Sequence, residues 1–252
     1  MSVATGEFKE SLLRPVSTLS NTRAPGSLYV DDGTIEALKW LAVILMVIDH
    51  TNKYLANASF RWAFDAGRVC LPLFCFVLAY NLTRVGVLEY GGYRRVMKRT
   101  ALVGTIATPI FILLGGLGLG WWPLNIMFTL CVATLMLFFV ARRGRLNMTY
   151  AVLVFVVGGI FVEYWWFALG MVLACWAFCN KPGAGSFVLV IIATAALYAV
   201  NQNFWAFAAL PIIALAPFIT ISAPRMRNLF YIVYPLHLAV LLGLRAYLGL
   251  HW

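Results

Sequence analysis

Residues 38–54 read LKWLAVILMVIDHTNKY, and this stretch decides the fold class. It is a largely apolar stretch, close to the length that crosses the hydrocarbon core of a bilayer as a helix. Similar runs recur along the 252 residues, of which 63% are hydrophobic and 11% charged. A soluble domain carries about 25% charged residues. The composition therefore excludes a soluble enzyme, a nucleic-acid-binding domain and a disordered chain, and it predicts an all-α polytopic membrane bundle.

Charge clusters and Gly/Pro signals divide the chain into about nine apolar segments: 38–56, 62–82, 97–117, 121–141, 149–162, 164–180, 186–200, 203–222 and 228–249. The fifth, sixth and seventh segments are shorter than the roughly 20 residues of a typical spanning helix. Region 149–180 has two readings, either two short tilted helices or one helix broken around Glu163. Interrupted segments of this kind often line a cavity in membrane proteins.

The basic residues indicate the orientation of the bundle. One set of loops holds 15 of the 19 lysines and arginines, and the alternate set holds only Lys53, Arg61, Arg68 and Arg245. Because cytoplasmic loops carry the excess of Lys and Arg, the first set is predicted to lie inside. Nine spans then give a cytoplasmic N-terminus and an external C-terminus. Topology also accounts for the net charge of +10, so no nucleic-acid partner is expected.

Residues 1–36 are predicted to be a polar cytoplasmic tail, and residues 37–252 the helical bundle. The tail contains Pro15 and Pro25 and lacks the apolar core of a signal peptide. We expect most of it to be mobile and the first apolar run to act as an uncleaved anchor. All five cysteines lie inside apolar runs without a C-x-x-C pair, which favours core residues over disulfides or a metal site.

The first span contains ionisable residues. Inserting a charged side chain at the centre of a membrane helix costs about 2.5–3.5 kcal/mol of free energy, so their presence requires an explanation. Lys39 sits at its cytoplasmic end, and Asp49 and His50 lie about 16 Å further along at 1.5 Å per residue. Lys39 and His50 share one helical face, three turns apart. Asp49 and Lys53 are four residues apart. They form either a structural ion pair or, with His50, part of a polar site.

Two other spans bring polar residues to a similar depth. Arg68 in the second span lies at nearly the level of His50, and its structural alternative is a pair with Asp65. His237 in the last span approaches the same level, about 13 Å from the inner start of that span. A His suits general-base work near neutral pH, and an Arg suits an oxyanion or a phosphate. The pattern predicts a polar site at membrane depth.

Three further polar residues are candidates for this site. Asn125 opens the fourth span and is either a site residue or a structural one. Glu163 has no local basic partner and is either a site acid or an exposed loop acid. Tyr234 lies three residues before His237 in the last span.

Four stretches, in the order 38–50, 66–82, 125–128 and 230–240, resemble the TraX family. This family comprises pilin acetylases of conjugative plasmids, with TrbP-like proteins grouped among them, and it is similar to the wider membrane acyltransferase-3 group. That group has a basic residue, ten intervening residues and a His in its first span, as Lys39 and His50 have here. The resemblance covers about residues 35–245. It implies acetyl transfer from cytoplasmic acetyl-CoA to the N-terminal amine of pilin, at the outer side of the bacterial inner membrane.

We therefore expect catalytic roles for His50, Asp49 and Arg68, and acetyl-CoA contacts for Lys39, Arg68 and Asn125. Substrate contacts or support of these groups are expected of Lys53, Glu163, Tyr234 and His237. No metal is expected. His50 either takes the proton of the amine or carries the acetyl group itself.

Two other functions stay open at this point. The same His and Arg would serve an O-acyltransferase acting on a sugar or lipid hydroxyl. A non-enzymatic membrane factor for pilus assembly, or a transporter, is the third reading. Residues 163–167, Glu-Tyr-Trp-Trp-Phe, depart from the family, which more often has Tyr-Gly there.

Overall fold

The computed structural model describes residues 23–116, 118–226 and 228–250, so the predictions for residues 1–22, for Arg227 and for Trp252 lie outside the described residues. The described chain is helical and contains no β-strand. In chain order the helices are α2 (Asp32–Leu55), α3 (Arg61–Gly67), α4 (Cys70–Leu82), α5 (Gly92–Leu113), α6 (Ile126–Arg142), α7 (Arg145–Phe161), α8 (Trp165–Asn180), α9 (Ala184–Ala196), α10 (Tyr198–Asn201), η2 (Trp205–Ala208), α11 (Ala209–Leu215), η3 (Ala216–Phe218) and α12 (Leu229–Tyr247).

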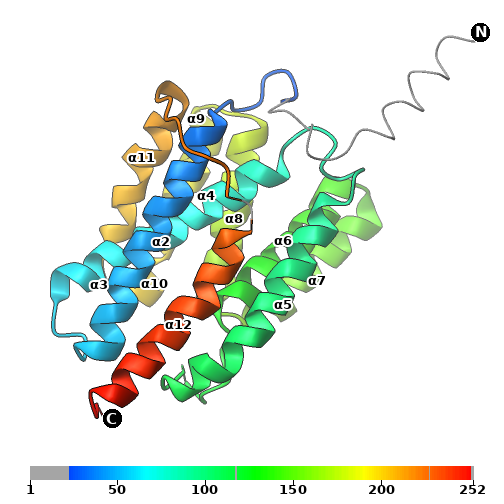
Figure 1. The fold of residues 1–252 in the computed structure, drawn as a ribbon. Coiled ribbons are helices and arrows are strands. Elements are labelled where there is room, and N and C mark those ends of the chain that lie inside the picture. Colours follow the sequence, from blue (N-terminus) through cyan, green and yellow to red (C-terminus); the bar gives the residue numbers. More distant parts are fainter. Residues whose placement is uncertain (1–22, 117, 227, 251–252) are drawn as a thin grey trace, which may run out of the picture.

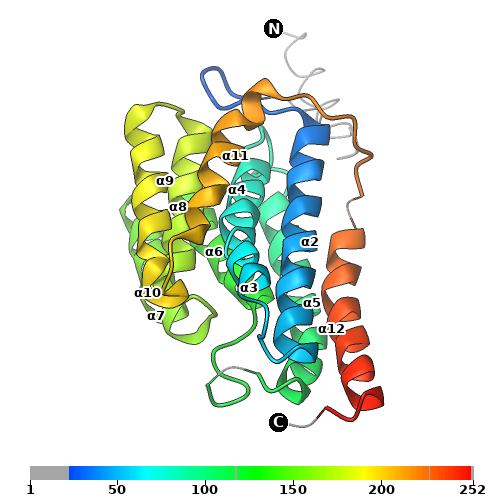
Figure 2. The ribbon, with the colours of Figure 1, turned by 90° about the vertical axis from the view of Figure 1, so that its left-hand side faces the viewer.

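The helices form one bundle in which successive segments run in alternating directions (Figure 1). The start of α2 and the end of α12 therefore lie at opposite ends of the bundle, which the view turned by 90° also shows (Figure 2). Region 149–180 is two helices, α7 and α8, joined by a tight turn at Tyr164. This confirms the first of the two readings for that region.

Four helical stretches of the described chain are long and apolar enough to cross a membrane: 61–82, 92–113, 184–201 and 229–247. Helices α6, α7 and α8 and the stretch 205–218 are also apolar but shorter. The chain is thus a helical membrane protein. The number of nine crossings stays a prediction.

Helix α4 forms the centre of the bundle. Most of its residues from Leu71 to Leu82 are buried, and it packs against α2, α8 and α11. A helix that is apolar on all sides is expected to be buried in this way. Helices α7 and α9 each bury only two residues and expose many large apolar side chains, which suits a surface that faces lipid.

The first helix begins earlier than predicted, at Asp32 rather than near residue 38. The cause is an N-cap, because the Asp31 carboxylate accepts a hydrogen bond from the Gly33 N–H at 2.8 Å. The last tail residues are also ordered against the bundle. The Val30 N–H donates to the Tyr80 hydroxyl at 2.9 Å, and the Arg23 guanidinium lies 3.4 Å above the Tyr80 ring. The prediction of a mobile tail is therefore wrong for residues 23–31.

The boundaries of α5 and α6 also differ from those predicted. The segments expected at 97–117 and 121–141 are helices at Gly92–Leu113 and Ile126–Arg142. Residues 114–116 and 118–125 lie outside helices instead, and hydrogen bonds hold the end of this segment against the end of α7. The Leu124 N–H donates to the Phe161 carbonyl at 2.7 Å, and the Glu163 N–H donates to the Leu124 carbonyl at 3.0 Å. These two bonds fix the turn that carries Glu163.

Candidate active site

A cavity of about 550 Å³ lies inside the bundle, between α2, the junction of α3 and α4, the start of α6, the turn between α7 and α8, and α12. It brings together residues that are far apart in the sequence. The predicted site residues among its lining are Asp49, His50, Lys53, Arg68, Glu163 and Tyr234.

His50, which lines this cavity, is in contact with His237 of α12. Helix α12 packs against α2, and this contact places His50 Nδ1 at 2.8 Å from His237 Nε2. The rings are stacked, with centroids 5.1 Å apart and planes inclined by 15°. The other ring nitrogen of His237, Nδ1, lies 3.0 Å from the carbonyl oxygen of Val233 one turn earlier in α12.

This chain of hydrogen bonds fixes the tautomers when both imidazoles are neutral. A carbonyl oxygen can only accept, so His237 carries its proton on Nδ1 and its Nε2 is an acceptor. His50 then donates from Nδ1, and its own Nε2 has a free lone pair. The partner of one ring nitrogen thus decides the state of the other. His50 is left with a defined nitrogen that can act as a base or a nucleophile.

Arg68 is held at the same cavity by three partners. Its Nη2 pairs with the Asp49 carboxylate of α2, its Nη1 donates to the Tyr164 hydroxyl at 3.3 Å, and its Nε donates to the Phe64 carbonyl at 3.2 Å. The guanidinium also lies 4.2 Å from the centre of the Phe64 ring. A guanidinium has five N–H donors, so two remain for a ligand. The arrangement provides an oriented positive group beside the paired histidines.

Helix α3 reaches Asp49 closely because residue 67 is a glycine. A Cβ atom at Gly67 would lie 2.5 Å from the Cβ and Cγ atoms of Asp49. Only a residue without a side chain allows the two helices to approach this far. The glycine therefore permits the ion pair between Asp49 and Arg68.

Both ion pairs within single helices, which the sequence left open as structural alternatives, are absent from the described structure. Asp65 pairs with Arg61 at 3.3 Å and not with Arg68. Asp49 pairs with Arg68, while Lys53 has no carboxylate within 4 Å among the described residues and lies 4.9 Å from the Tyr54 ring centre. The observed buried pair joins two helices, which the spacing within one helix does not indicate.

The turn between α7 and α8 contributes Glu163 and Tyr164 to the cavity. The reading of Glu163 as an exposed loop acid is wrong, because it is half-buried and lines this cavity. Tyr164 was not among the predicted site residues, although its hydroxyl accepts a hydrogen bond from Arg68. The backbone of Tyr164 has φ +61°, a conformation that non-glycine residues rarely adopt and that clusters at functional sites. A polar aromatic residue between two short apolar segments was the available signal.

Asn125 has a structural role in this protein. It is 1% exposed, and its side-chain oxygen caps α6 by accepting from the Met127 N–H at 3.1 Å. Its amide nitrogen donates to the Gly104 carbonyl at 3.0 Å and to the Thr108 hydroxyl at 3.1 Å. Since the protein itself uses these groups, the geometry favours the structural alternative over a contact with acetyl-CoA.

Lys39 lies at a second cavity, nearer the start of α2. Its ammonium pairs with Glu36 at 2.5 Å and donates to the Met226 carbonyl at 3.3 Å. The two basic residues expected to bind acetyl-CoA, Lys39 and Arg68, therefore line different cavities.

The sequence is similar to proteins of a single family. The family model described as TraX protein matches residues 34–245. Protein TraX of Escherichia coli is 30% identical over 127 residues, which cover 50% of this chain and 48% of that protein. Protein TraX of Escherichia coli strain K12 is 28% identical over 127 residues, with the same shares. The chain spans about half the length of the curated relatives it matches.

No solved structure gives a significant match to this chain. The family model nevertheless covers all the residues that line the cavity, from Met46 on α2 to Tyr234 on α12, and also His237, which contacts His50. The match thus extends over most of the chain, and the protein belongs to the TraX family.

Proposed function

We propose that this protein is a membrane acetyltransferase. It would move an acetyl group from cytoplasmic acetyl-CoA to the N-terminal amine of a conjugative pilin, at the outer side of the bacterial inner membrane. Membership of the TraX family supports this proposal. The observation that carries it is the pair His50–His237, which gives His50 a free Nε2 at a cavity that also contains Arg68.

The proposed reaction uses His50 as a general base. An α-amino group has a pKa of about 8, so it must lose a proton to become a good nucleophile. The first proton leaves to solvent. The neutral amine nitrogen then bonds to the acetyl carbonyl carbon, its second proton passes to Nε2 of His50, and the carbon–sulfur bond breaks. The departing sulfur then takes the proton from His50. The products are an N-acetylated pilin and coenzyme A as the free thiol, and His50 is neutral again.

Arg68 and Tyr164 supply donors for the charge that develops on the carbonyl oxygen. Arg68 has two N–H groups left over, and Tyr164 can donate its hydroxyl proton because it only accepts from Arg68. Donors that are fixed before the reaction stabilise such charge most effectively. Asp49 holds the guanidinium in place, and Lys53, Glu163 and Tyr234 line the space for the acceptor.

The free Nε2 of His50 also suits a two-step route, in which His50 attacks the thioester and carries the acetyl group to the amine. Incubation with acetyl-CoA in the absence of any acceptor distinguishes the two routes. Mass spectrometry of the protein would show an acetyl group on the peptide that contains His50 only in the two-step route.

Intact-mass spectrometry of the host's pilin, with and without this gene, tests the function. We expect the pilin to gain the mass of one acetyl group with the wild-type gene, to lack it with His50→Ala, and to keep it with Asp65→Asn. Asp65 is a suitable control because it lies near Arg68 in sequence but pairs with the exposed Arg61. An unmodified pilin with a well-inserted wild-type protein would refute the pilin as acceptor. Acetylated sugar or lipid in the same cells would then favour an O-acyltransferase. The absence of any acetylated product would favour a pilus-assembly factor.

A further inference from the structure

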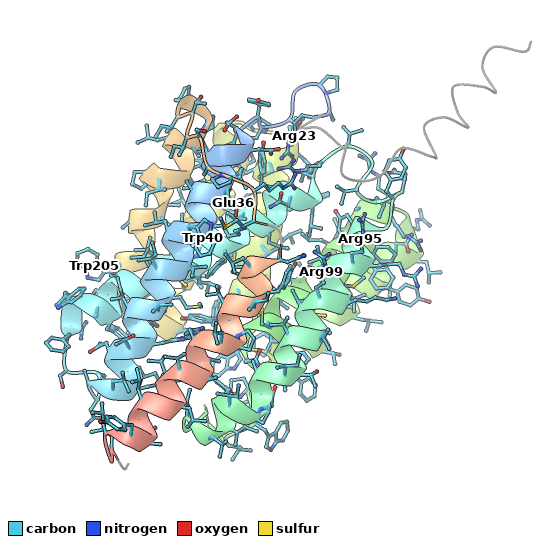
Figure 3. The ribbon with its side chains drawn as sticks, in the orientation of Figure 1. Arg23, Glu36, Trp40, Arg95, Arg99 and Trp205 are labelled. Carbon is cyan, nitrogen blue, oxygen red and sulfur yellow. The ribbon has the colours of Figure 1, made fainter. Side chains whose placement is uncertain are left out.

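The second cavity, of about 300 Å³, lies toward the end of the bundle where α2 begins. Helices α2, α4, α5 and α12 surround it, and Arg23, Glu36 and Arg95 all lie toward this end (Figure 3). Its lining is strongly basic. The charged residues of the lining are Lys39, Arg84, Arg95, Arg99 and Arg225, with Asp32 and Glu36.

Carboxylates partner three of the five basic residues at this cavity. Lys39 pairs with Glu36 at 2.5 Å. Arg84 and Arg225 both pair with Asp32, at 2.5 Å and 3.8 Å. These contacts neutralise much of the charge on the α2 side of the cavity.

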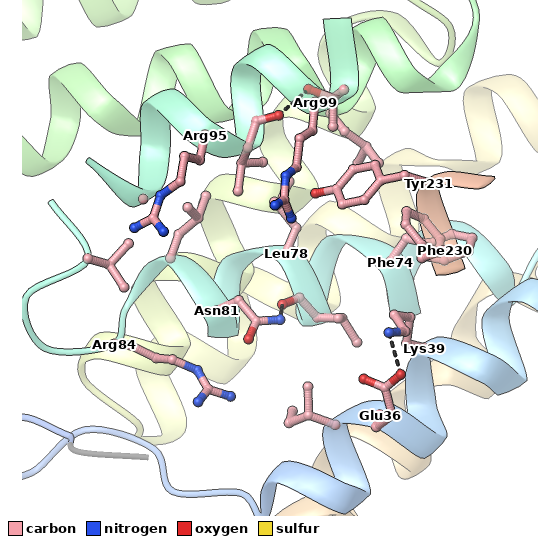
Figure 4. A pocket seen from close by; sticks show the side chains of 18 of the residues that line it. Glu36, Lys39, Phe74, Leu78, Asn81, Arg84, Arg95, Arg99, Phe230 and Tyr231 are labelled. Carbon is pink, nitrogen blue, oxygen red and sulfur yellow. Dashed lines mark hydrogen bonds and ion pairs between the residues drawn. The ribbon is translucent and has the colours of Figure 1, made fainter. Parts of the chain in front are cut away.

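Arg95 and Arg99 differ from the other three, since neither has a carboxylate within 4 Å in the described part of the chain. Arg95 donates to the Tyr90 carbonyl at 3.0 Å, and Arg99 lies 5.7 Å from the centre of the Tyr231 ring. They are four residues apart on α5, and both point from α5 toward α4, across the cavity from Arg84 and Lys39 (Figure 4). Planar guanidinium groups bind phosphate oxygens in a bidentate way. The pair therefore suits a ligand with several phosphates.

The basic cavity adjoins the histidine cavity. Phe74 of α4 and Leu130 of α6 line both of them, so these two side chains form the wall between the cavities. The Phe74 ring also packs against Phe230 of α12, with centroids 5.3 Å apart. An apolar wall of this kind suits the passage of a thin, uncharged chain and excludes phosphates, because charge is costly away from water.

We infer that the basic cavity holds the phosphate-bearing nucleotide end of the acyl donor through Arg95 and Arg99, while the thin acyl-carrying arm passes Phe74 and Leu130 toward His50. This inference rests on the proposed function, because it assumes a donor of the coenzyme A type. It assigns two arginines that the histidine cavity does not contain, and a route past the two apolar side chains that line both cavities. An anionic lipid headgroup shares the phosphate chemistry and is the competing occupant.

Binding of coenzyme A to the purified protein, measured by calorimetry, tests this inference without any turnover. The double variant Arg95→Gln/Arg99→Gln should bind coenzyme A at least about tenfold more weakly, since charged hydrogen bonds are the stronger ones. The matched control is Arg94→Gln/Lys98→Gln, which removes the same charge from exposed neighbours on α5 that do not line the cavity. It should bind within about twofold of the wild type, as expected of exposed charges at a distance. Pantetheine, which lacks the nucleotide and its phosphates, should bind all three proteins alike.

The inference would be overturned if both double variants weakened the binding of coenzyme A equally. It would also be overturned if neither variant weakened it. It would also be overturned if phosphatidylglycerol nanodiscs abolish the binding of coenzyme A while phosphatidylcholine nanodiscs preserve it, because the headgroup would then be the occupant. All four positions are exposed, and the melting temperature of each variant checks the fold. If the double variant fails to fold, the single variants Arg95→Gln and Arg99→Gln are measured in its place. The two proposals can fail separately. If binding of coenzyme A depends on Arg95 and Arg99 but the pilin is not acetylated in cells, the proposed acceptor is refuted and the coenzyme A site stands.

Discussion

At the scale of single residues, two hydrogen bonds determine which nitrogen of His50 is left without a proton. The Val233 carbonyl orients His237, and His237 in turn orients His50. Neither histidine pairs with a carboxylate in the described structure, so the backbone is the end of this chain of hydrogen bonds. We therefore propose that His237 is a positioning residue, which acts by offering an acceptor to His50 Nδ1.

Two substitutions of His237 should differ in effect. In His237→Gln the amide oxygen can accept from His50 Nδ1, so we expect kcat within about tenfold of the wild type, well short of the loss of a general base. His237→Leu offers no acceptor, and kcat should fall by about 10²-fold, the lower end of the general-base range. Initial rates of labelled acetyl transfer measure this difference. Equal rates for the two variants would show that the hydrogen bond is not used.

Arg68 requires its fork geometry. A lysine in its place could pair with Asp49, but it could not also donate to Tyr164 and to the Phe64 carbonyl. Removal of one oxyanion donor typically costs about 10²–10³ in kcat, so Arg68→Lys should lose at least about tenfold. The kcat of Tyr164→Phe should fall by a smaller factor, and the kcat of Asp65→Asn should be near that of the wild type. Steady-state kinetics with normal expression measure the effect, and a near wild-type rate for Arg68→Lys would leave it a structural ion pair.

The residues also show what sequence reasoning can and cannot reach. Counting the rise per residue placed His50 and His237 at one depth, and they are in hydrogen-bond contact. The same reasoning offered pairs within one helix as an alternative, such as Asp49 with Lys53, whereas the half-buried pair joins Asp49 to Arg68. Helical spacing reports depth along one axis. It does not report how neighbouring helices are rotated toward each other.

At the scale of elements, the close approach of α3 to α2 is a requirement of the site. Gly67→Ala places a methyl group against Asp49, and either the helix or the carboxylate must move. Such overpacking typically costs about 1–3 kcal/mol of stability. We expect a lower melting temperature and a loss of activity, because the pair with Arg68 is disturbed.

Gly170→Ala is the matched control for this element. A Cβ atom at Gly170 on α8 would have no heavy atom within 4 Å, and alanine favours a helix. Its melting temperature should be equal or higher and its activity unchanged. If the two variants behave alike, the contact between α3 and α2 does not limit the site.

The sequence predicted which segments are helical better than it predicted where each helix begins and ends. Each predicted apolar segment corresponds to a helical segment, but α2 and α5 begin several residues early because Asp31 caps one and Gly91, with φ +69°, begins the other. The turn that carries Glu163 and Tyr164 could not be predicted in detail. Its shape depends on hydrogen bonds to the distant residue Leu124.

At the scale of the whole molecule, the two cavities lie in series between the end where α2 begins and the interior of the bundle. The alternating helices place the start of α2 and the end of α12 at opposite ends (Figure 1). If the excess of Lys and Arg lies on the cytoplasmic side, as the distribution of basic residues predicts, the basic cavity would face the cytoplasm. The donor and the acceptor would then reach His50 from opposite sides of the membrane.

Cysteine labelling in intact cells tests this orientation. A membrane-impermeant maleimide should label Leu250→Cys from outside and should label Arg94→Cys and Arg145→Cys only after the cells are opened. All three positions are exposed. The wild type is the control, because its five cysteines are buried or half-buried. Outside labelling of Arg94→Cys would invert the topology and place the basic cavity on the wrong side for a cytoplasmic donor.

We propose above that acetyl transfer depends on Nε2 of His50 as the general base. The most direct measurement is the rate of labelled acetyl transfer from acetyl-CoA to pilin by the purified protein in nanodiscs, which leave both faces accessible. We predict that His50→Ala lowers kcat by at least about 10²-fold relative to the wild type, as expected for the loss of a general base, while its melting temperature and binding of coenzyme A stay near normal. A folded His50→Ala protein that transfers acetyl at the wild-type rate would contradict the account.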